Sequence, residues 1–296
     1  MTKQSPNWTD IQSENPGLHF DHIALLGEGW GSWAYGINHA WVFKLPKRAG
    51  DWDENITEQA VLAFVQPHLP LTVPKPMLHR PTSAGWPHGY AVSTFVPGQP
   101  IDLPKMTAMQ RAAAAHALGD FLRALHALEP DDDLRAVLPR ADPLGEFQDL
   151  VELAETKVFP QLSTHTAKQV RTAAHRYLAD GANFHYRPAL IHGDLHHEHI
   201  LTQDGVVTGI IDFGDAQLGD SDWDFSDFLL ELGAEFTTAY ARAYGHPDPQ
   251  GLIHKLWRRS LFGYLHDIMY GPEFGLPEDV EGAWAGLQEW LRQAGE

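Results

Sequence analysis

The chain contains no cysteine among its 296 residues. Disulfide bonds and thiolate metal sites are therefore excluded, and a cytoplasmic location is expected. The N-terminal residues lack an apolar run after a basic start, and eighteen consecutive apolar residues occur nowhere. We therefore expect neither a secretion signal nor a membrane partner. Basic residues are also scarce, since 21 lysines and arginines stand against 39 acids. This balance argues against nucleic-acid binding, which needs basic patches for the phosphates.

The formal net charge of -18 suits a cationic partner. A negative surface attracts cations and raises their local concentration. Ordinary solubility explains the same charge, and composition leaves both explanations open. The length allows either one large domain or two lobes, and no segment of twenty to fifty residues repeats.

Two apolar runs in the middle of the chain each deliver an acidic residue. Residues 190–201 read LIHGDLHHEHIL, and residues 209–215 read GIIDFGD. Phosphoryl transfer needs one carboxylate that faces the acceptor hydroxyl and further ligands that hold Mg²⁺. Protein kinases supply these groups from the motifs HRDxxxxN and DFG. The same spacing here predicts Asp194 as the base and His199 and Asp212 as the Mg²⁺ ligands.

These paired motifs resemble the aminoglycoside phosphotransferase and kinase-like family, whose catalytic loop begins His-Gly-Asp. A histidine at position 199, together with the run IIDFGDA, is most similar to the aminoglycoside 2''-phosphotransferases. Macrolide phosphotransferases also carry that histidine. The resemblance covers residues 23–290 and implies an α+β, two-lobed, protein-kinase-like fold. Its N-terminal lobe would be an antiparallel sheet with a helix, and its C-terminal lobe would be mainly helical.

Several segments of residues 1–97 predict a nucleotide site. The turn GEGWGS at 27–32 has glycines that let backbone N–H groups approach phosphates, although its third glycine comes one place earlier than in GxGxxG. The strand-like run 40–46 carries Lys44 where a kinase has its phosphate-contacting lysine, and the helical run 55–65 carries its candidate partner Glu58. Lys47 and Glu54 are the alternatives.

By resemblance, residues 94–96 form a hinge that binds the purine of ATP or GTP. The purely structural explanations are a glycine-rich hairpin for residues 27–32 and an edge strand for residues 94–96. The candidate cofactor-binding residues are Gly27, Gly29, Gly31, Ser32, Lys44, Glu58, Ser93, Thr94, Phe95 and Val96.

A change from strand-like to helical composition at residues 97–98 predicts a lobe boundary there. Residues 1–97 would form the nucleotide-binding lobe, and residues 98–296 the catalytic and substrate-binding lobe. Apolar spacing predicts helices over 107–128, 142–158, 164–182, 222–232, 234–244 and 250–270. The acidic run 131–133 is interpreted as a solvated connector, and contact with an amine-bearing substrate is the alternative.

Polar residues around the catalytic loop receive supporting roles. His192 is expected to orient the loop through hydrogen bonds, and His196 and His197 to be solvated. Asp204 and Gly205 predict a hairpin that holds His199 beside Asp212. By resemblance, Asp220 and Asp224 anchor the loop from below. His116 and His126 are expected to pack in a helix rather than act as ligands.

A cationic sugar would need carboxylates for its ammonium groups and an aromatic side chain beside its rings. The run 270–275 resembles the segment that lines the substrate cleft of the 2''-phosphotransferases. Any one of the candidates is also explained as a surface charge. The candidate substrate residues are Glu198, Asp215, Glu231, Glu235, Asp267, Tyr270 and Glu273.

The sequence therefore predicts a Mg²⁺-dependent phosphotransferase that moves the γ-phosphate of ATP or GTP to an aminoglycoside hydroxyl. A macrolide kinase is an alternative, and it would need an apolar cleft. A kinase for choline, homoserine or a sugar is a second alternative. A nucleotide-binding pseudokinase is a third, which the intact acids argue against. The hydroxyl, the purine and the oligomeric state stay open at this level.

Overall fold

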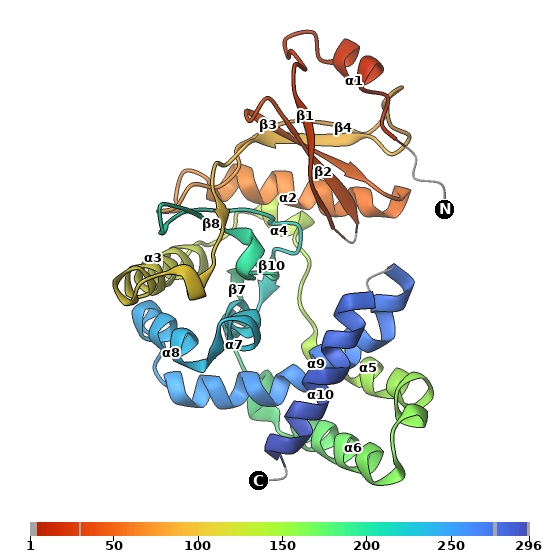
Figure 1. The fold of residues 1–296 in the computed structure, drawn as a ribbon, viewed down its shortest axis with the longest axis vertical. Helices are drawn as coiled ribbons and strands as arrows, with labels where there is room; N and C mark the ends of the chain where they lie inside the picture. Colours follow the sequence, from red (N-terminus) through yellow and green to blue (C-terminus); the bar gives the residue numbers. More distant parts are fainter. Residues whose placement is uncertain (1–4, 30, 275–276, 295–296) are drawn as a thin grey trace.

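The computed structural model describes residues 5–29, 31–274 and 277–294, with side chains except at positions 54, 273–274 and 277–279. A small, sheet-containing lobe lies above a larger, mainly helical lobe (Figure 1). This is the kinase-like α+β architecture that the sequence predicts, with an antiparallel sheet in the first lobe. Among the helices in these ranges, none combines the length and the apolar character that a membrane crossing requires.

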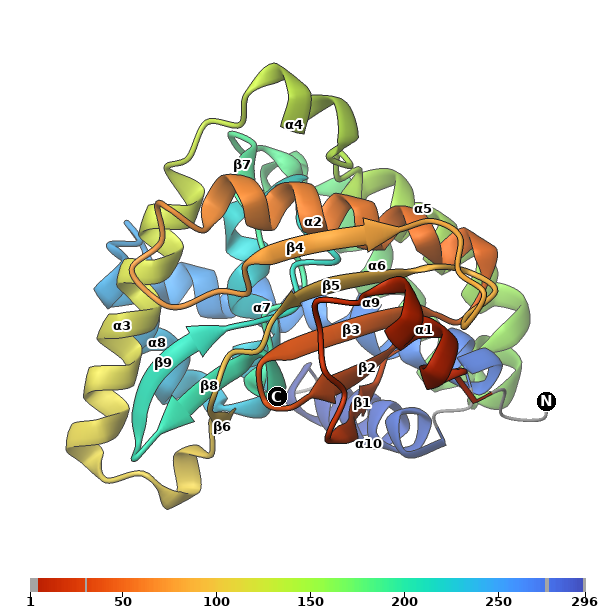
Figure 2. The same cartoon turned by 90° about the horizontal axis from the view of Figure 1, so that it is seen from above.

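The N-terminal lobe is a five-stranded antiparallel sheet flanked by two α-helices. Viewed from above, α2 runs along β4 and β5 on one side of the sheet (Figure 2). In spatial order the strands are β1 (Ile23–Glu28), β2 (Ser32–Ile37), β3 (Trp41–Pro46), β5 (Tyr90–Thr94) and β4 (Pro76–Arg80), with the helices α1 (Trp8–Glu14), η1 (Ala49–Asp51) and α2 (Trp52–Val65).

The helix α1 has no counterpart in the sequence-based prediction. Asn7 caps it by accepting a hydrogen bond from the Asp10 amide, which is the usual role of asparagine at a helix start. Its only buried apolar side chain, Ile11, packs in a cluster with Phe43 and Tyr90 from the sheet. The helix is seven residues long, so one apolar side chain was too weak a periodic signal to predict it.

The C-terminal lobe begins with a short strand and is otherwise built from helices around two small sheets, in which β6 pairs with β8, β8 with β9, and β7 with β10. Its elements are β6 (Gln99–Pro100), η2 (Leu103–Lys105), α3 (Ala108–His126), α4 (Asp132–Val137), α5 (Pro143–Lys157), η3 (Phe159–Gln161), α6 (Thr164–Ala179), η4 (Gly181–Phe184), β7 (Ala189–Ile191), η5 (His197–His199), β8 (Ile200–Gln203), β9 (Val206–Ile210), β10 (Gln217–Gly219), η6 (Ser221–Phe225), α7 (Ser226–Glu231), α8 (Gly233–Tyr244), α9 (Pro249–Phe274) and α10 (Pro277–Ala294).

Local capping chemistry explains most of the helix starts. Thr107 forms a capping box with Gln110 at the start of α3, and Asp142 with Pro143 starts α5 as predicted. The interpretation of residues 131–133 as a connector is wrong. Asp131 accepts a hydrogen bond from the Leu134 amide and begins α4, and an acidic first turn suits the positive end of the helix dipole.

Two helix boundaries in the second half of the chain also differ from the predictions. The segment expected as one helix over 222–232 is a 3₁₀ turn, η6, followed by α7. The run from 270 was expected to leave the helix, but α9 continues through Pro272 to Phe274. Proline disfavours a helix interior because it lacks an N–H group and clashes with the preceding turn. Here the helix nevertheless continues past that position.

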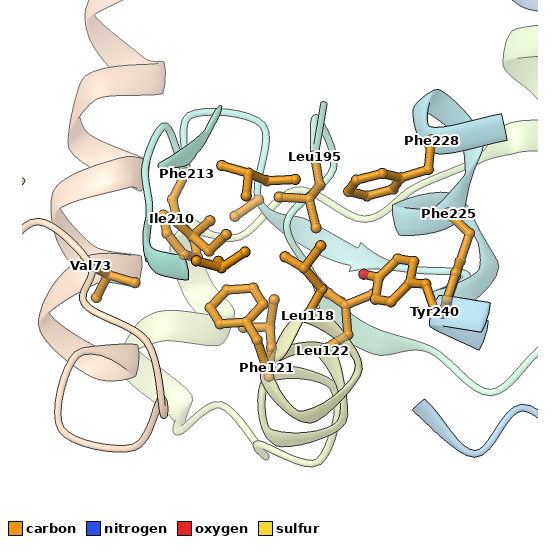
Figure 3. Close-up of a cluster of buried hydrophobic side chains, with 14 of the residues drawn as sticks. Val73, Leu118, Phe121, Leu122, Leu195, Ile210, Phe213, Phe225, Phe228 and Tyr240 are labelled. Atoms are coloured by element: carbon orange, nitrogen blue, oxygen red, sulfur yellow. The ribbon is translucent and has the colours of Figure 1, made fainter. Parts of the chain in front are cut away.

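The largest hydrophobic cluster lies directly beneath the two acidic motifs (Figure 3). Leu195 and Phe213, which follow Asp194 and Asp212, are both buried in it. The cluster also contains Val61 from α2, so the helix of the first lobe packs into the core of the second. Burial of one side chain in each motif thus fixes the direction in which its neighbouring acid points.

Phe121 tests how far this cluster supports the fold. The Phe121 side chain is fully buried in α3, and we expect Phe121→Ala to lower the free energy of unfolding by about 3–5 kcal/mol because it leaves a cavity. Urea denaturation followed by circular dichroism measures the change. Met109 lies on the same helix with 82% of its surface exposed, and Met109→Ala should change stability by less than about 0.5 kcal/mol. Equal losses in the two variants would contradict this account of the core.

Candidate active site

Two left-handed backbone positions shape the loops that carry the acids. Gly193, just before Asp194, has φ +87°, and a Cβ there would overlap the carbonyl of Asp215. Asp212 itself has φ +67°. Glycine adopts this conformation freely, and aspartate is among the few other residues that tolerate it. Both carboxylates therefore leave the backbone at sharp turns on top of the core.

Asp224 holds the catalytic loop through its backbone. Its carboxylate accepts hydrogen bonds from the amides of His192 and Gly193, both at 2.9 Å. It also contacts the imidazole of His126 at 2.9 Å. Burial opposes the charged form, but the hydrogen bonds and electrostatic attraction of the surrounding groups, His126 first among them, together outweigh it, and the pKa of Asp224 is lowered. The expected anchoring role of Asp224 is confirmed, whereas Asp220 instead pairs with Lys255 of α9 at 2.8 Å.

His192 orients the loop without titrating near neutral pH. The ring is fully buried, and its Nε2 faces the carbonyl oxygen of Ile211 at 3.0 Å. Burial lowers the pKa of His192 to about 4, so the imidazole is neutral. The hydrogen-bonding role expected from the sequence is confirmed.

His199 lies between Asp194 and Asp212 and faces each of them with a different ring nitrogen. The Nδ1 of His199 lies 2.8 Å from the backbone carbonyl of Asp194 and 3.7 Å from its carboxylate. Because a carbonyl can only accept, this contact places a proton on Nδ1, and in the corresponding neutral tautomer the lone pair of Nε2 points outward. That lone pair faces a carboxylate oxygen of Asp212 at 3.6 Å.

This pairing of His199 with Asp212 fits a divalent cation. In the neutral tautomer, two atoms with lone pairs face each other without a hydrogen between them, and a cation is a partner that both accept. Carboxylate oxygen suits Mg²⁺, which binds one or two protein carboxylates and keeps several waters. The imidazole nitrogen is a less usual ligand for a hard cation.

Lys44 joins the two lobes at the site. Its ammonium group lies 2.7 Å from Glu58 and 2.9 Å from Asp212. Burial disfavours the charged ammonium, but Asp212 and Glu58 raise the pKa of Lys44 above its ordinary value. Burial likewise opposes the charge on Asp212, yet Lys44 and then His199 lower its pKa. Burial raises the pKa of Glu58, against the attraction of Lys44.

The predicted pairing of Lys44 with Glu58 is therefore confirmed by the geometry. The alternative lysine, Lys47, lies 3.1 Å from Glu28 and above the ring of Trp33. The side chain of the alternative acid, Glu54, lies outside the described residues.

The glycine-rich turn joins β1 to β2 beside Lys44. The amide of Gly29 donates to the carbonyl of Ser32 at 3.0 Å, and the carbonyl of Gly31 accepts from Lys47 at 2.7 Å. A side chain at Gly27 would meet no described heavy atom within 4 Å. Neither Gly27 nor Gly29 has a positive φ, so glycine here leaves open space and is not needed for a left-handed turn.

The predicted hinge has one free amide among its three. Thr94 N–H donates to Lys75 and Phe95 N–H donates to Ala40. Within the described part of the chain, the amide of Val96 has no such backbone partner. Ser93, one residue earlier, pairs with Val42 inside the sheet.

The carboxylate of Asp194 lies among other acids. Partial removal from water raises the pKa of Asp194, against the effect of His196. Burial raises the pKa of Asp215 to about 6, and the negative charges of Asp194 and Asp212 contribute to this rise. Burial, then Asp194 and Glu231, raises the pKa of Asp227 to about 8. Asp227 was missed by the sequence analysis, although it lies one helical turn before Glu231 on α7 and shares its face.

The remaining substrate candidates lie in different surroundings. Glu231 binds His197 at 2.7 Å, and Glu198 is exposed. Asp267 contacts His266 at 3.0 Å, and Lys157 lies over the ring of Tyr270. For Glu235, Asp267 and Tyr270, no contact with Asp194 is found in the described ranges, and the side chain of Glu273 lies outside them.

The expectation that His196 is simply solvated is wrong, whereas His197 is 41% exposed but also bonded to Glu231. The side chain of His196 is 21% exposed and lies 3.8 Å from the Asp194 carboxylate. Its ring centroid is 3.8 Å from that of His199. Burial and then His199 lower the pKa of His196. His197 is tied to Glu231 by its backbone amide as well as its ring.

Comparison with known proteins gives a consistent result. A family model described as "Phosphotransferase enzyme family" matches residues 22–253. The uncharacterized protein YcbJ of Bacillus subtilis (strain 168) is 26% identical over 215 residues, which are 69% of this chain and 67% of that protein. A solved GDP and kanamycin complex of APH(2")-IIia is 26% identical, covers 97% of this chain and 98% of its own, and has a TM-score of 0.88. A structure of macrolide 2'-phosphotransferase type I is 20% identical, covers 95% of each chain and has a TM-score of 0.72, which shows a similar fold.

The raised pKa of Asp227 predicts a pH-dependent gain in stability for Asp227→Asn. Its carboxyl has a pKa of about 8 in the folded chain, against about 3.9 when unfolded. The folded state thus binds more protons between these values, and stability falls as pH rises through that range. Asparagine imitates the protonated form, so it should add about 1–3 kcal/mol at pH 7, after allowance for partial exposure.

Urea unfolding at several pH values measures this gain. The gain should vanish below about pH 3, where wild-type Asp227 is protonated in both states. Asp149 lies exposed on α5, and Asp149→Asn is the matched control with no such gain. A variant of Asp227 that is no more stable than wild type at pH 7 would contradict the crowding of acids described above.

Proposed function

Because the chain belongs to the phosphotransferase enzyme family and has its kinase-like fold, we propose that it moves the γ-phosphate of ATP or GTP to a hydroxyl of an aminoglycoside. The observation that carries the proposal is the meeting of Asp194, His199 and Asp212, with Lys44 alongside. A base, two ligands for a cation and a phosphate-binding ammonium are the parts that phosphoryl transfer requires.

In the proposed reaction Asp194 accepts a hydrogen bond from the acceptor hydroxyl. The hydroxyl oxygen bonds to the γ-phosphorus, its proton passes to Asp194, and the bond to the bridging oxygen of the nucleoside diphosphate breaks. His199 and Asp212 would hold Mg²⁺, which neutralises charge on the transferred group. A base works best when its pKa is near the working pH, and the pKa of Asp194 is raised in that direction.

The nucleotide site that we propose uses the open side of the first lobe. The ammonium of Lys44 has three N–H donors, of which Glu58 and Asp212 take two. The third is available to a phosphate oxygen. The open space at Gly27 lets a phosphate approach the backbone of the turn, which includes Gly29, Gly31 and Ser32. Among the described residues, the amide of Val96 and the carbonyls of Thr94 and Phe95 remain for the purine, whereas the backbone of Ser93 is paired in the sheet.

The proposal of an aminoglycoside as the substrate depends on the negative charge around Asp194. Asp215, Asp227 and Glu231 surround the base, and ammonium groups of a cationic sugar would relieve their repulsion. The protein in the GDP and kanamycin complex, a similar structure, binds an aminoglycoside. We also propose a cytoplasmic location and no nucleic-acid partner, on the evidence of composition alone.

Replacement of the base tests the chemistry. We expect Asp194→Ala to lower turnover by a factor of about 10² to 10⁴, since positioned general-base catalysis contributes about that much. Nucleotide affinity should stay within about threefold, because Asp194 faces the acceptor rather than the purine. A coupled assay of nucleoside diphosphate release measures turnover, and calorimetry with ADP or GDP measures binding. Retention of most turnover would remove Asp194 from the reaction.

The substrate class is tested with purified protein and a panel of acceptors. We expect nucleoside diphosphate release with kanamycin, and little with a macrolide or with choline, when ATP and GTP are each supplied. A bacterial host that carries the gene should tolerate more kanamycin than one carrying the Asp194→Ala form. Release with the macrolide alone, or with choline alone, would replace the aminoglycoside as the substrate while leaving the phosphotransfer reaction intact.

A further inference from the structure

A second group of metal-binding side chains lies beside the proposed Mg²⁺ ligands. It consists of His196, His197 and Glu231, whose nitrogen and oxygen ligand atoms all lie within 4.8 Å of one another. None of the three belongs to the proposed Mg²⁺ ligands His199 and Asp212. From this arrangement we propose that His196, His197 and Glu231 bind a divalent transition-metal ion of the Zn²⁺ class.

Hydrogen bonds and ring contacts hold the three side chains in place. One carboxylate oxygen of Glu231 accepts from both the ring Nδ1 of His197, at 2.7 Å, and its backbone amide, at 3.0 Å. The ring of His196 lies against those of His197 and His199, with centroids 5.9 Å and 3.8 Å away. The carboxylate comes from α7 and the histidines from the catalytic loop, so two separate elements supply the ligands.

The donor set selects the kind of metal. Two imidazoles and one carboxylate are the ligands of many Zn²⁺ sites, with water in the fourth position. In such a tetrahedron neighbouring ligand atoms are about 3.4 Å apart, so ligands already within 4.8 Å need only small side-chain rotations. Mg²⁺ prefers an oxygen environment and would not choose this pair of nitrogens.

The site is open to an incoming ion. The side chains of His197 and Glu231 are 41% and 33% exposed, and that of His196 is 21% exposed. An ion there would displace the proton that His197 shares with Glu231. It would also take Glu231 away from an amine-bearing substrate, and this consequence alone rests on the proposed function.

A neighbouring group gives a competing location. Asp194, His196 and His199 also lie within 4.8 Å of one another, and His196 is common to both groups. An ion there would occupy the base and one Mg²⁺ ligand. His197 and His199 therefore distinguish the two locations, since each belongs to only one group.

Zinc binding by the full chain, without a histidine tag, tests the proposal. Zn²⁺ is titrated in competition with a chromogenic chelator, with millimolar Mg²⁺ present to occupy oxygen-rich sites. The wild type should bind one Zn²⁺ tightly, and His196→Ala, His197→Ala and Glu231→Gln should each weaken this binding at least about tenfold. Co²⁺ in place of Zn²⁺ should give a visible absorption band in the wild type that His197→Ala loses. Circular dichroism without metal checks that each variant is folded.

Two further variants make the result decisive. His22 and His39 form a separate histidine pair in the first lobe, with ring centroids 5.5 Å apart, and His39→Ala should leave Zn²⁺ affinity unchanged. His199→Ala should also retain the tight site. Loss of binding in His199→Ala but not in His197→Ala would overturn the proposal in favour of the group with Asp194. Loss in His39→Ala, or equal binding by all variants, would overturn it as well.

Discussion

The partly buried ammonium group of Lys44 sets the relation between the parts of the site. Lys44 comes from the sheet, Glu58 from α2, and Asp212 from the loop after β9, and all three meet within hydrogen-bonding distance. A charge that is removed from water is tolerated only when it is paired. Removal of any one of these three side chains would therefore leave another with an unpaired charge, which costs free energy. The amide of Phe213 also faces Glu58, at 3.3 Å. The first lobe is thus tied to the second at the place where a phosphate would lie.

The rest of the second lobe holds the acids at that place. In both motifs an acid precedes a buried apolar residue, Leu195 in one and Phe213 in the other. Leu195 and Phe213 fill the core (Figure 3), while the side chains of Asp194 and Asp212 remain 43% and 38% exposed. Hydrogen bonds from the loop amides to Asp224 fix the first motif, and pairing of β8 with β9 brings the second beside it. Packing of the apolar residues therefore sets the direction of the acidic side chains, and hydrogen bonding sets the position of the loops that carry them.

The sequence predicted what short-range patterns encode. The hairpin at Asp204 and Gly205, with φ values of +51° and +76°, is confirmed, and so is the pairing of Lys44 with Glu58. Contacts between distant segments escaped it. Asp224 and His126 are 98 residues apart, and the crowding of Asp227 by Asp194 exists only after α7 has packed beside the loop. The same limit explains why His196 was taken for a solvated residue. The roles of the nucleotide, metal and substrate residues remain predictions.

The carboxylates of the site differ in how well their negative charge is balanced by nearby positive charge, and their pKa values differ accordingly. Asp212 has Lys44 beside it, and its pKa is lowered. The pKa values of Asp194, Asp215 and Asp227 are all raised, because desolvation and mutual repulsion exceed what nearby cations return. An arrangement of this kind is destabilising for the folded chain on its own. It becomes favourable when positive charge enters, and each cation that binds makes it easier for these carboxyls to ionise. The binding of cations and the ionisation of the proposed base, Asp194, are therefore linked through the electrostatic potential of these carboxylates.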